Sequence, residues 1–238
     1  MIDVEKESLK DLERIVSETK KWGLKLVIIG GYAVIAHIGK YYRATKDIDF
    51  VAPKARMGTL RGLLKEFGYD VHSTQFGLKG RKKLNGGSIN LDISIEEVFD
   101  VSTQKKYTSS RSTFLDSKML EVGGRTKETE NMKVKARVIS LEELFLLKLM
   151  TKGRDKDTVD VISLLMDKSG EVNVNKFAEH CSRAGLKEHI RGQILNFIGL
   201  VRRGDARKIW FTITGKRLML KTEAEIIRFL RMLANELR

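Results

Sequence analysis

Two aspartates separated by a single residue, Asp47 and Asp49, are the side chains with the clearest capacity for chemistry. They accompany a short apolar segment that we expect to be a strand, so both carboxylates point to one face while Ile48 and Phe50 point to the other. Two neighbouring carboxylates repel each other unless a cation lies between them. Carboxylate oxygens suit Mg²⁺, which binds one or two protein carboxylates together with the phosphates of a substrate. The pair therefore predicts a metal site that handles a phosphate compound.

A pair of glycines, Gly30-Gly31, precedes these aspartates by about fifteen residues. The apolar stretch before it, Leu24–Ile29, is typical of a buried strand, and the apolar residues of Tyr32–Ile38 after it have helical spacing. A glycine turn of this kind exposes backbone N–H groups at a helix N-terminus, where phosphate binds readily. The separation from the aspartates is short enough for two adjacent strands of one sheet. Together the turn and the carboxylates have the outline of a nucleotide site.

The neighbouring elements must hold this site in place. An amphipathic helix is expected over Asp3–Trp22, and a second helix over Met57–Phe67. Weak alternation in Tyr69–Phe76 indicates an exposed or edge strand, and the lysine-rich segment Gly77–Gly87 is expected to be a loop or hairpin tip. These elements predict a small mixed sheet that contains the aspartate strand and is flanked by helices.

A third carboxylate, Asp92, lies in the next clear strand, Ser88–Ile95. The apolar face of that strand carries Ile89, Leu91, Ile93 and Ile95. Asp92 is on the opposite face, in the middle of the strand, where aspartate is depleted. It is either an exposed residue on a half-solvated sheet or a third member of the carboxylate site.

The pattern of two glycines, about fifteen residues and then Asp-hydrophobic-Asp-hydrophobic resembles the signature of the polymerase-beta-like nucleotidyltransferase superfamily. The stretch GGYAVIAHIGKYYRATKDIDF, with its Arg-x-Thr-x-Asp run Arg43–Asp47, is most similar to AbiEii-type and related minimal nucleotidyltransferases. The resemblance is good over Leu24–Val51 and weaker to about Leu165. Many members have Gly-Ser at the turn, with the serine hydroxyl touching phosphate. Here Gly31 stands at that position, so the hydroxyl is missing or is supplied elsewhere.

The resemblance implies roles for the residues around the turn. Asp47 and Asp49 would hold the metal, and Asp92 would complete the metal site and help to deprotonate the attacking hydroxyl. The nucleotide would be bound by the residues that match the motif, namely Gly30, Gly31, Arg43, Thr45 and the more distant Lys148.

A second matching segment lies further along the chain, where one helix is expected from Leu141 to Met150 or Thr151 and another over Lys156–Leu165. By resemblance, Lys148 would neutralise triphosphate charge, and Asp157 would orient a basic group or the acceptor hydroxyl. The active-site acid on the second helix is Asp157 or Asp160. The ordinary alternative is a lysine that extends from an amphipathic helix and an aspartate that supports a helix N-terminus.

Strands are expected at Lys118–Val122 and Met132–Val138. In the C-terminal part, the spacing of apolar residues predicts helices over Val174–Cys181, Lys187–Val201 and Thr222–Leu237. A strand-like or bent patch is expected at Lys208–Thr214. Residues 183–238 hold thirteen Lys/Arg and five Asp/Glu, and this excess of eight positive charges is more than half of the chain's net charge of +14. Basic residues cluster there around Trp210 and Phe211, which are either core residues or a platform for bases.

Composition places the 238-residue chain among soluble globular proteins. Its net charge of +14 indicates an anionic partner, with nucleic acid or nucleotide favoured over a membrane surface, unless the charge merely reflects a lysine-rich surface. The single cysteine, Cys181, excludes an intramolecular disulfide. No apolar run is long enough to span a bilayer, and the polar start is unlike a signal peptide, so we expect a cytoplasmic protein without membrane contact.

The sequence thus predicts an α/β fold with a nucleotidyltransferase domain, residues 1–139, and a mainly helical, basic domain, residues 140–238. The expected enzyme uses Mg²⁺ or Mn²⁺ to move a nucleoside monophosphate from an NTP to an acceptor hydroxyl, with RNA or tRNA as the favoured acceptor. Small molecules such as aminoglycosides, a protein side chain, and a non-catalytic RNA-binding module on the same fold are the alternatives. The resemblance also implies a possible toxin with a cognate antitoxin protein.

Overall fold

The computed structural model describes residues 3–38, 43–124 and 128–238. The chain divides into two compact units. The first contains the chain up to Phe99 together with Thr108–Ser140, and the second contains Asp100–Tyr107 and Leu141–Arg238. That residues 1–139 and 140–238 form two separate domains remains a prediction. In the described part of the chain no helix is both long and apolar enough to cross a membrane.

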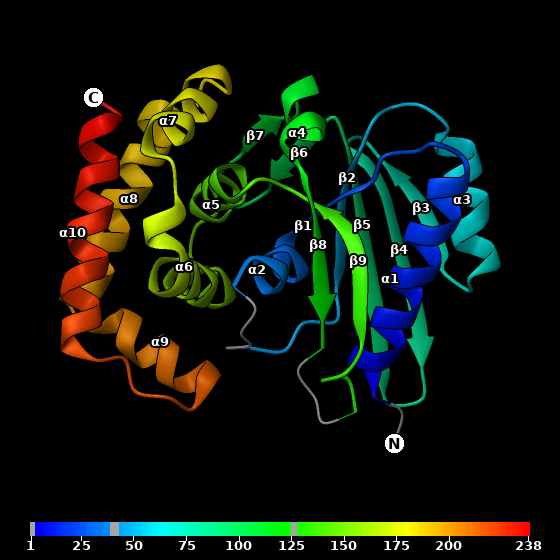
Figure 1. Cartoon of the computed structure of the whole chain (residues 1–238), viewed down its shortest axis with the longest axis horizontal. Coiled ribbons are helices and arrows are strands. Elements are labelled where there is room, and N and C mark those ends of the chain that lie inside the picture. The colour runs from blue at the N-terminus through cyan, green and yellow to red at the C-terminus, as the bar shows by residue number, and fades with distance from the viewer. Residues whose placement is uncertain (1–2, 39–42, 125–127) are drawn as a thin grey trace. The chain divides into compact units, whose positions relative to one another are not determined.

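The first unit is built on a seven-stranded mixed sheet with helices on both faces (Figure 1). Its helices are α1 Val4–Lys21, α2 Gly30–Ile38, α3 Met57–Glu66 and α4 Arg111–Asp116. The strands of the sheet are β1 Val27–Ile29, β2 Ile48–Ala52, β3 Asp70–Thr74, β4 Gly77–Leu84, β5 Gly87–Ile95, β8 Lys118–Gly123 and β9 Lys133–Val138. A separate two-stranded sheet is formed by β6 Glu97–Asp100 and β7 Lys105–Thr108.

The strand order of the large sheet is β3-β4-β5-β2-β1-β9-β8. Strands β2 and β5 are parallel neighbours near its centre, and β1 runs antiparallel to β2 on the other side. Helix α2 follows β1 without a loop, since β1 ends at Ile29 and the helix begins at Gly30. The glycine turn and the aspartate strand are therefore carried by adjacent strands, as the sequence predicted.

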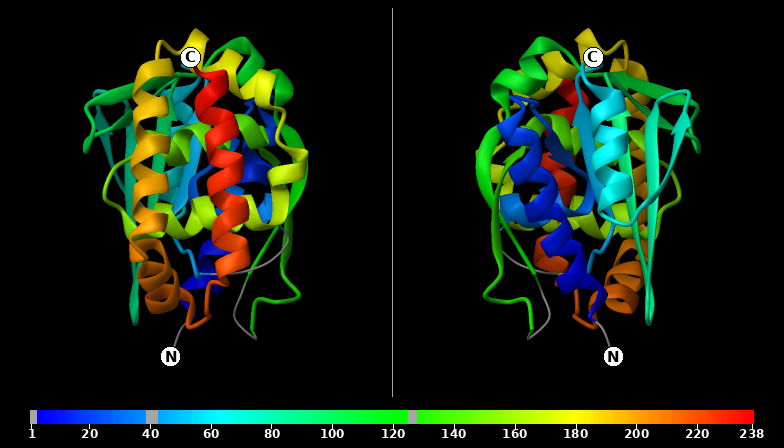
Figure 2. Two further views of the ribbon diagram at one scale, coloured as in Figure 1. Left: turned by 90° about the vertical axis from the view of Figure 1, so that its left-hand side faces the viewer. Right: turned by 90° about the vertical axis from the view of Figure 1, so that its right-hand side faces the viewer.

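The two faces of the sheet are covered by different helices. Figure 1 shows α2 on one side and α1 and α3 on the other, and the right-hand view of Figure 2 shows α1 and α3 lying over the sheet. The core beneath α1 is fully buried and includes Leu9, Leu12, Ile15, Ile48, Phe50, Ile89 and Ile93. Because side chains alternate along a strand, the residues between these apolar ones in β2 and β5 face α2. Asp49 and Asp92 belong to that second face.

The second unit is helical. It consists of α5 Leu141–Met150, α6 Asp155–Lys168, α7 Val174–Arg183, α8 Lys187–Arg202, α9 Asp205–Thr214 and α10 Leu220–Glu236, with a short 3-10 turn at Ser169–Glu171. Helix α5 is apolar on nearly all sides and lies at the centre of this unit. Helices α8 and α10 run side by side, as the left-hand view of Figure 2 shows. Phe145, Phe177 and Trp210 are among its largest buried side chains.

The α/β class, the mixed sheet and the helical C-terminal part are confirmed. The predicted edge strand is β3, at the end of the strand order. The strand expected over Leu24–Ile29 is shorter and begins only at Val27. Asp47 lies just before β2 instead of inside it. The polar loop expected before Asp47 includes residues 39–42, which lie outside the described residues.

Two predicted irregular segments are wrong. Gly77–Gly87, expected to be a loop or hairpin tip, is strand β4 followed by a tight turn into β5. The exposed Lys79, Arg81 and Lys83 alternate with Leu78, Gly80 and the half-buried Lys82, and a lysine on the inward side concealed the alternation. Lys208–Thr214, expected to be a strand-like patch, belongs to α9, because burial of Ala206 and Trp210 at helical spacing overrides the β-propensity of Ile, Trp and Phe.

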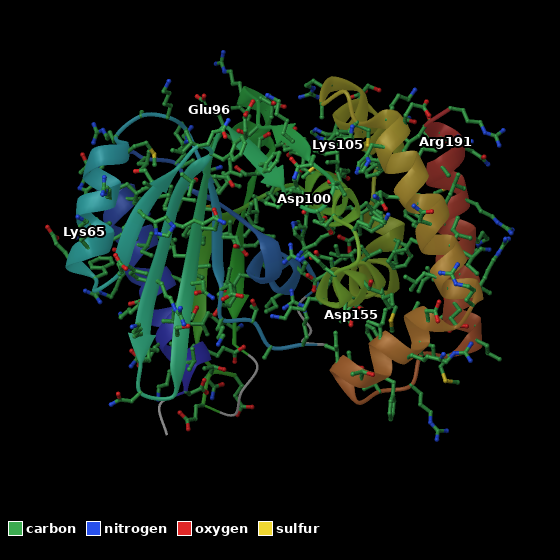
Figure 3. The ribbon with its side chains drawn as sticks, turned by 180° about the vertical axis from the view of Figure 1, so that it is seen from behind. Lys65, Glu96, Asp100, Lys105, Asp155 and Arg191 are labelled. Carbon is green, nitrogen blue, oxygen red and sulfur yellow. The ribbon has the colours of Figure 1, made fainter. Side chains whose placement is uncertain are left out.

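The hairpin β6–β7 was not predicted, because its strands of four residues are too short for a periodic signal. The Asp100 carboxylate holds the turn between them, accepting hydrogen bonds from the Thr103 amide at 2.8 Å and from the hydroxyls of Ser102 and Thr103. Figure 3 labels Asp100 and Lys105, which lie on the two sides of this turn.

Candidate active site

Three carboxylates lie on one face of two neighbouring strands. In the parallel register of β2 and β5, Asp49 is the direct partner of Asp92. Asp47 precedes Asp49 by two residues, so its side chain has the same orientation as that of Asp49. All three residues are partly exposed. The sheet therefore brings together the three acids that the sequence singled out.

Polar neighbours from β4 and β5 contact two of these acids. The Asn90 amide donates a hydrogen bond of 2.9 Å to Asp47 Oδ1, and Lys79 Nζ lies 3.4 Å from Asp92 Oδ2. Lys79 is also the partner of Asp92 in the antiparallel register of β4 and β5. No role is predicted for Lys79 from the sequence, because its segment is expected to be a loop and only the pairing of β4 with β5 places this cation opposite Asp92.

The glycine turn touches the aspartate strand directly. Gly30 opens α2 with a φ of +69°, a conformation that favours glycine. A Cβ placed on Gly30 would lie only 2.0 Å from Asp49 Oδ2 and 2.9 Å from Asp49 Cβ. The absence of a side chain at Gly30 therefore lets the Asp49 carboxylate lie against the start of the helix. The first N–H groups of a helix have no partner within it, so anions bind there.

A buried chain of hydroxyl groups fixes the backbone that leads into β2. The Tyr32 hydroxyl donates to Ser8 Oγ at 3.0 Å, and the Ser8 hydroxyl donates to the carbonyl oxygen of Lys46 at 2.8 Å. Burial raises the pKa of Tyr32 well above its ordinary value, so the phenol remains a donor at every physiological pH. Helices α1 and α2 thus hold the residue before Asp47. No motif pointed to Ser8 or Tyr32.

Two further residues of the Arg-x-Thr-x-Asp run lie beside the turn. An Arg43 guanidinium nitrogen is 3.1 Å from the position of a Cβ on Gly31, and the other terminal nitrogen donates to the carbonyl of Ala44 at 3.2 Å. Thr45 is a buried residue, and its hydroxyl lies on the same side of Gly31. A cation and a hydroxyl therefore accompany the backbone N–H groups at the start of α2.

The donor set of this face suits a divalent metal. Among the described residues no group of three His, Cys, Asp or Glu side chains has the close arrangement of a preformed metal site. Mg²⁺ needs only one or two protein carboxylates, because substrate phosphates and water supply its remaining oxygen ligands. The neighbouring positions of Asp47, Asp49 and Asp92 meet that requirement. The residues present therefore fit a metal that arrives with its nucleotide.

Lys148, Asp157 and Asp160 come together in the second unit. Lys148 Nζ is 2.8 Å from Asp157 Oδ1 and 2.7 Å from Asp160 Oδ2, and its side chain is only 9% exposed. Asp157 also accepts a hydrogen bond from the Thr151 hydroxyl at 2.9 Å and lies 3.2 Å from Arg154 Nε. The basic groups in contact with Asp157 are therefore Lys148 and Arg154. Both acids left open by the sequence hold that lysine.

A cavity of about 560 Å³ borders this cluster within the second unit. Its lining includes Lys148, Thr151, Arg154, Gln193, Asn196 and Phe197. Small-molecule sites commonly measure about 300–1,000 Å³ and combine apolar walls with a few polar groups. The cluster thus lies at the wall of a hollow large enough for part of a nucleotide or a small acceptor.

The family described as "Nucleotidyl transferase of unknown function (DUF2204)" matches residues 8–195 of the chain. The match includes the glycine turn, the three carboxylates and the Lys148 cluster. The chain belongs to this nucleotidyltransferase family. It is a nucleotidyltransferase, as its glycine and aspartate motif predicted. A search of curated proteins found no match.

Solved structures of nucleotidyltransferases resemble this one. The antibiotic-resistance factor ANT(2'')-Ia is 17% identical, with 78% of this chain and 97% of that chain covered and a TM-score of 0.51, which shows a shared fold. The lincosamide antibiotic adenylyltransferase LnuA is 17% identical over 65% of this chain and 94% of that one, with a TM-score of 0.43. A tRNA nucleotidyltransferase solved with a primer tRNA and an ATP analog is 18% identical, with 90% of this chain and 62% of that chain covered and a TM-score of 0.34.

The Lys148 cluster should make the stability of this nucleotidyltransferase depend on pH. Burial alone would raise the pKa of Asp157, but Lys148, Arg154 and the Thr151 hydroxyl outweigh burial and hold that pKa below its ordinary value. A carboxyl with a lowered pKa stabilises the fold above its unfolded-state pKa of about 4, and the contribution is lost as pH falls through the folded-state value. We expect Asp157→Asn to lower the free energy of unfolding at pH 7 by roughly 2 kcal/mol.

Thermal unfolding followed by circular dichroism between pH 7 and pH 2.5 measures this effect. The Tm of Asp157→Asn should be lower than that of the wild type at pH 7, and the two should converge in acid. Asp155→Asn is the matched control, because Asp155 is exposed in the same helical turn (Figure 3). Equal acid sensitivity of the wild type and Asp157→Asn would show that the buried ion pair does not stabilise the fold.

Proposed function

We propose that this nucleotidyltransferase is Mg²⁺-dependent (or Mn²⁺-dependent) and transfers a nucleoside monophosphate from an NTP to a hydroxyl group of RNA, with tRNA as the leading candidate. One observation carries the proposal: Asp49 lies directly beside Asp92 and against Gly30 at the start of α2. Metal-binding acids and an anion-binding helix start thus meet at one point of the sheet. This arrangement provides the charge neutralisation and positioning on which nucleotidyl transfer depends.

Each acid of the face has a proposed task. Asp47 and Asp49 hold the metal, which would neutralise charge on the triphosphate when bound. The Asn90 amide, at 2.9 Å, keeps Asp47 in position. Asp92 accepts the proton of the acceptor hydroxyl as its oxygen bonds to the α-phosphorus and the bond to the leaving pyrophosphate breaks. Lys79 balances the charge of Asp92 before substrate binds.

The triphosphate is assigned to the start of α2. Gly30 and Gly31 have no side chains that would cover their backbone N–H groups, and Arg43 lies beside Gly31. A guanidinium can donate two parallel hydrogen bonds to a phosphate, which adds direction as well as charge. We assign Lys148 to the nucleotide as well, with Asp157 and Asp160 setting its position.

RNA is favoured as acceptor by a surface of the second unit that we call the basic–aromatic patch: Lys208, Phe211, Arg217, Met219, Leu220 and Lys221. These residues line a hollow of about 570 Å³ where α9 turns into α10. Phe211, expected to be either core or platform, is 55% exposed, whereas Trp210 is buried in the core. Across the described residues no ion pair involves Lys208, Arg217 or Lys221. Exposed aromatic groups among cations stack bases and bind phosphates.

Removing the exposed ring should weaken RNA binding. Stacking of one base is worth about 1–3 kcal/mol, so Phe211→Ala should raise the Kd for single-stranded RNA by about 5- to 150-fold. Lys221→Gln should instead reduce the slope of log Kd against log salt by less than one. Fluorescence anisotropy with a labelled oligonucleotide measures both. Leu115→Ala, which removes an exposed leucine from α4, is the control, and wild-type affinity in Phe211→Ala would refute the patch.

Incubation with each α-labelled NTP, Mg²⁺ and total tRNA, followed by a denaturing gel, tests the acceptor. Label on RNA with one NTP supports the proposal. Label on the protein itself would identify a protein-modifying enzyme, and pyrophosphate release with aminoglycoside-like compounds alone would identify a small-molecule acceptor. RNA binding without any transfer would identify a binding module. We also propose, from the AbiEii-type resemblance alone, a toxin role with an antitoxin protein as partner, and growth arrest on induced expression would support the toxin role.

A further inference from the structure

Helices α8 and α10, which run side by side in the second unit (Figure 2), share an open groove of about 720 Å³. We call it the arginine groove. Its lining includes Arg202 of α8 together with Ala224, Arg228, Arg231, Met232 and Glu236 of α10. None of these residues belongs to the carboxylate face, the Lys148 cluster or the basic–aromatic patch.

The charge of the groove comes from three arginines. Arg202, Arg228 and Arg231 are exposed, and within the described part of the chain their side chains form no ion pair or hydrogen bond. Glu236 is the single acid among the described residues that line the groove. A planar guanidinium can donate two parallel hydrogen bonds to one phosphate, so arginine suits phosphates better than a simple point charge does. The groove therefore suits a ligand that carries several phosphates.

The arginine groove differs from the basic–aromatic patch in one chemical respect. The patch presents the exposed ring of Phe211, on which an unpaired base can stack. The described residues that line the groove include no aromatic ring. Bases in a duplex are already paired and stacked, so a protein holds a duplex mainly through its phosphates and sugars. Arginines without a ring therefore favour double-stranded RNA over a single strand.

The groove continues from the patch along one face of α10. Residues at intervals of three or four share a face of a helix, and the patch and the groove are linked by such a row: Lys221, Ala224, Arg228 and Arg231. At about 1.5 Å per residue, Lys221 and Arg231 are about 15 Å apart along the helix axis. This length matches several successive phosphates of one strand.

We propose that the arginine groove binds the phosphate backbone of an RNA stem, beside the single strand that the basic–aromatic patch holds. The acceptor is then an RNA whose unpaired end adjoins a duplex. This inference rests on RNA as the proposed acceptor. An acidic helix of a partner protein would also match the arginines, but the continuity of the groove with the patch favours RNA.

Fluorescence anisotropy with three labelled RNAs tests the groove: a blunt hairpin, a single strand, and the hairpin with that strand as its tail. The groove variant, Arg202→Gln/Arg228→Gln/Arg231→Gln, should raise the Kd for both hairpins about tenfold or more. It should also reduce the slope of log Kd against log salt for the hairpins by about two to three. At physiological salt, which screens distant charges, its Kd for the single strand should stay within about threefold of the wild type.

Arg61→Gln/Lys65→Gln/Arg111→Gln is the matched control, because it removes three positive charges from exposed positions of α3 and α4 (Figure 3 labels Lys65). Its affinity for all three RNAs should equal that of the wild type. Phe211→Ala should show the converse of the groove variant, with weaker binding of the single strand and unchanged binding of the blunt hairpin. Circular dichroism verifies that each variant folds.

Wild-type affinity of the groove variant for both hairpins overturns the inference, and so does an equal loss for the single strand. If the groove variant keeps its hairpin affinity but loses binding to a glutamate-rich amphipathic peptide that the wild type binds, the groove belongs to an acidic protein partner instead. A wild-type protein that binds none of the three RNAs would refute RNA as the acceptor. Failure of the proposed function is therefore distinguishable from failure of the groove.

Discussion

Asp49→Asn will lower nucleotidyl transfer by about a thousandfold or more and leave the fold intact. Asp49 is the direct partner of Asp92 in the parallel register and lies against Gly30, so it belongs to the proposed metal site and borders the proposed triphosphate site. Asparagine has nearly the same shape but lacks the charge that holds a metal. Initial rates of label transfer measure the loss. Asp49→Ala should have the same effect, since only the carboxylate performs this task.

The matched control for Asp49 is Asp70→Asn. Asp70 is an exposed aspartate at the start of the edge strand β3, so its variant carries the same change of charge without affecting the site. Its rate should equal that of the wild type, and all three proteins should share one far-ultraviolet dichroism spectrum. Turnover retained in Asp49→Asn would remove this residue from the metal site.

Gly30→Ala is expected to have the second largest effect. The new Cβ would lie 2.0 Å from Asp49 Oδ2, and a φ of +69° is strained for alanine. The strain alone costs on the order of 1–3 kcal/mol of folding free energy. Because the collision also moves the Asp49 carboxylate, activity should fall by about a hundredfold or more even where the protein is fully folded. Activity and the Tm measure the two losses separately.

A glycine in open space provides the comparison for Gly30. A Cβ on Gly62, in helix α3, would have no heavy atom within 4 Å. Gly62→Ala should raise the free energy of unfolding by about 0.5–1 kcal/mol, because alanine is the better helix former, and should leave the rate unchanged. A Gly30→Ala protein with the activity of Gly62→Ala would show that Asp49 does not need to lie against the turn.

Much of the first unit could be predicted from the sequence, because its elements are marked by strong local signals. Helix α1 has a regular apolar spacing, and the alternation in β5 placed Asp92 on the face opposite Ile89 and Ile93. The glycine pair marked the start of α2. These signals are carried by near neighbours in the chain, so they remain readable without the fold.

What the sequence did not reveal depends on pairing between distant segments. Lys79 meets Asp92 only because β4 pairs with β5, and Ser8 reaches the Lys46 carbonyl from a different helix. The helical state of α9 is decided by burial of Trp210 against local propensity. In each case tertiary contacts determine the structure, and no short window of sequence contains them.

The Lys148 cluster also shows what a sequence pattern cannot decide. The sequence singled out Lys148, Asp157 and Asp160 and left open which of the two acids is the active-site acid. In the folded chain one turn of α6 separates the two acids, and a single ammonium group contacts both. Sequence spacing could not decide between Asp157 and Asp160, because both positions allow contact with Lys148.

The most direct test of the proposed reaction compares two labels. The wild-type protein is incubated with tRNA, Mg²⁺ and one NTP that carries label at either the α- or the γ-phosphorus, and the products are separated on a denaturing gel. We predict that the α-label enters RNA and the γ-label leaves as pyrophosphate, with both events lost in Asp49→Asn. Transfer of the γ-label to RNA, or α-label transfer that persists in Asp49→Asn, would contradict nucleotidyl transfer by these carboxylates.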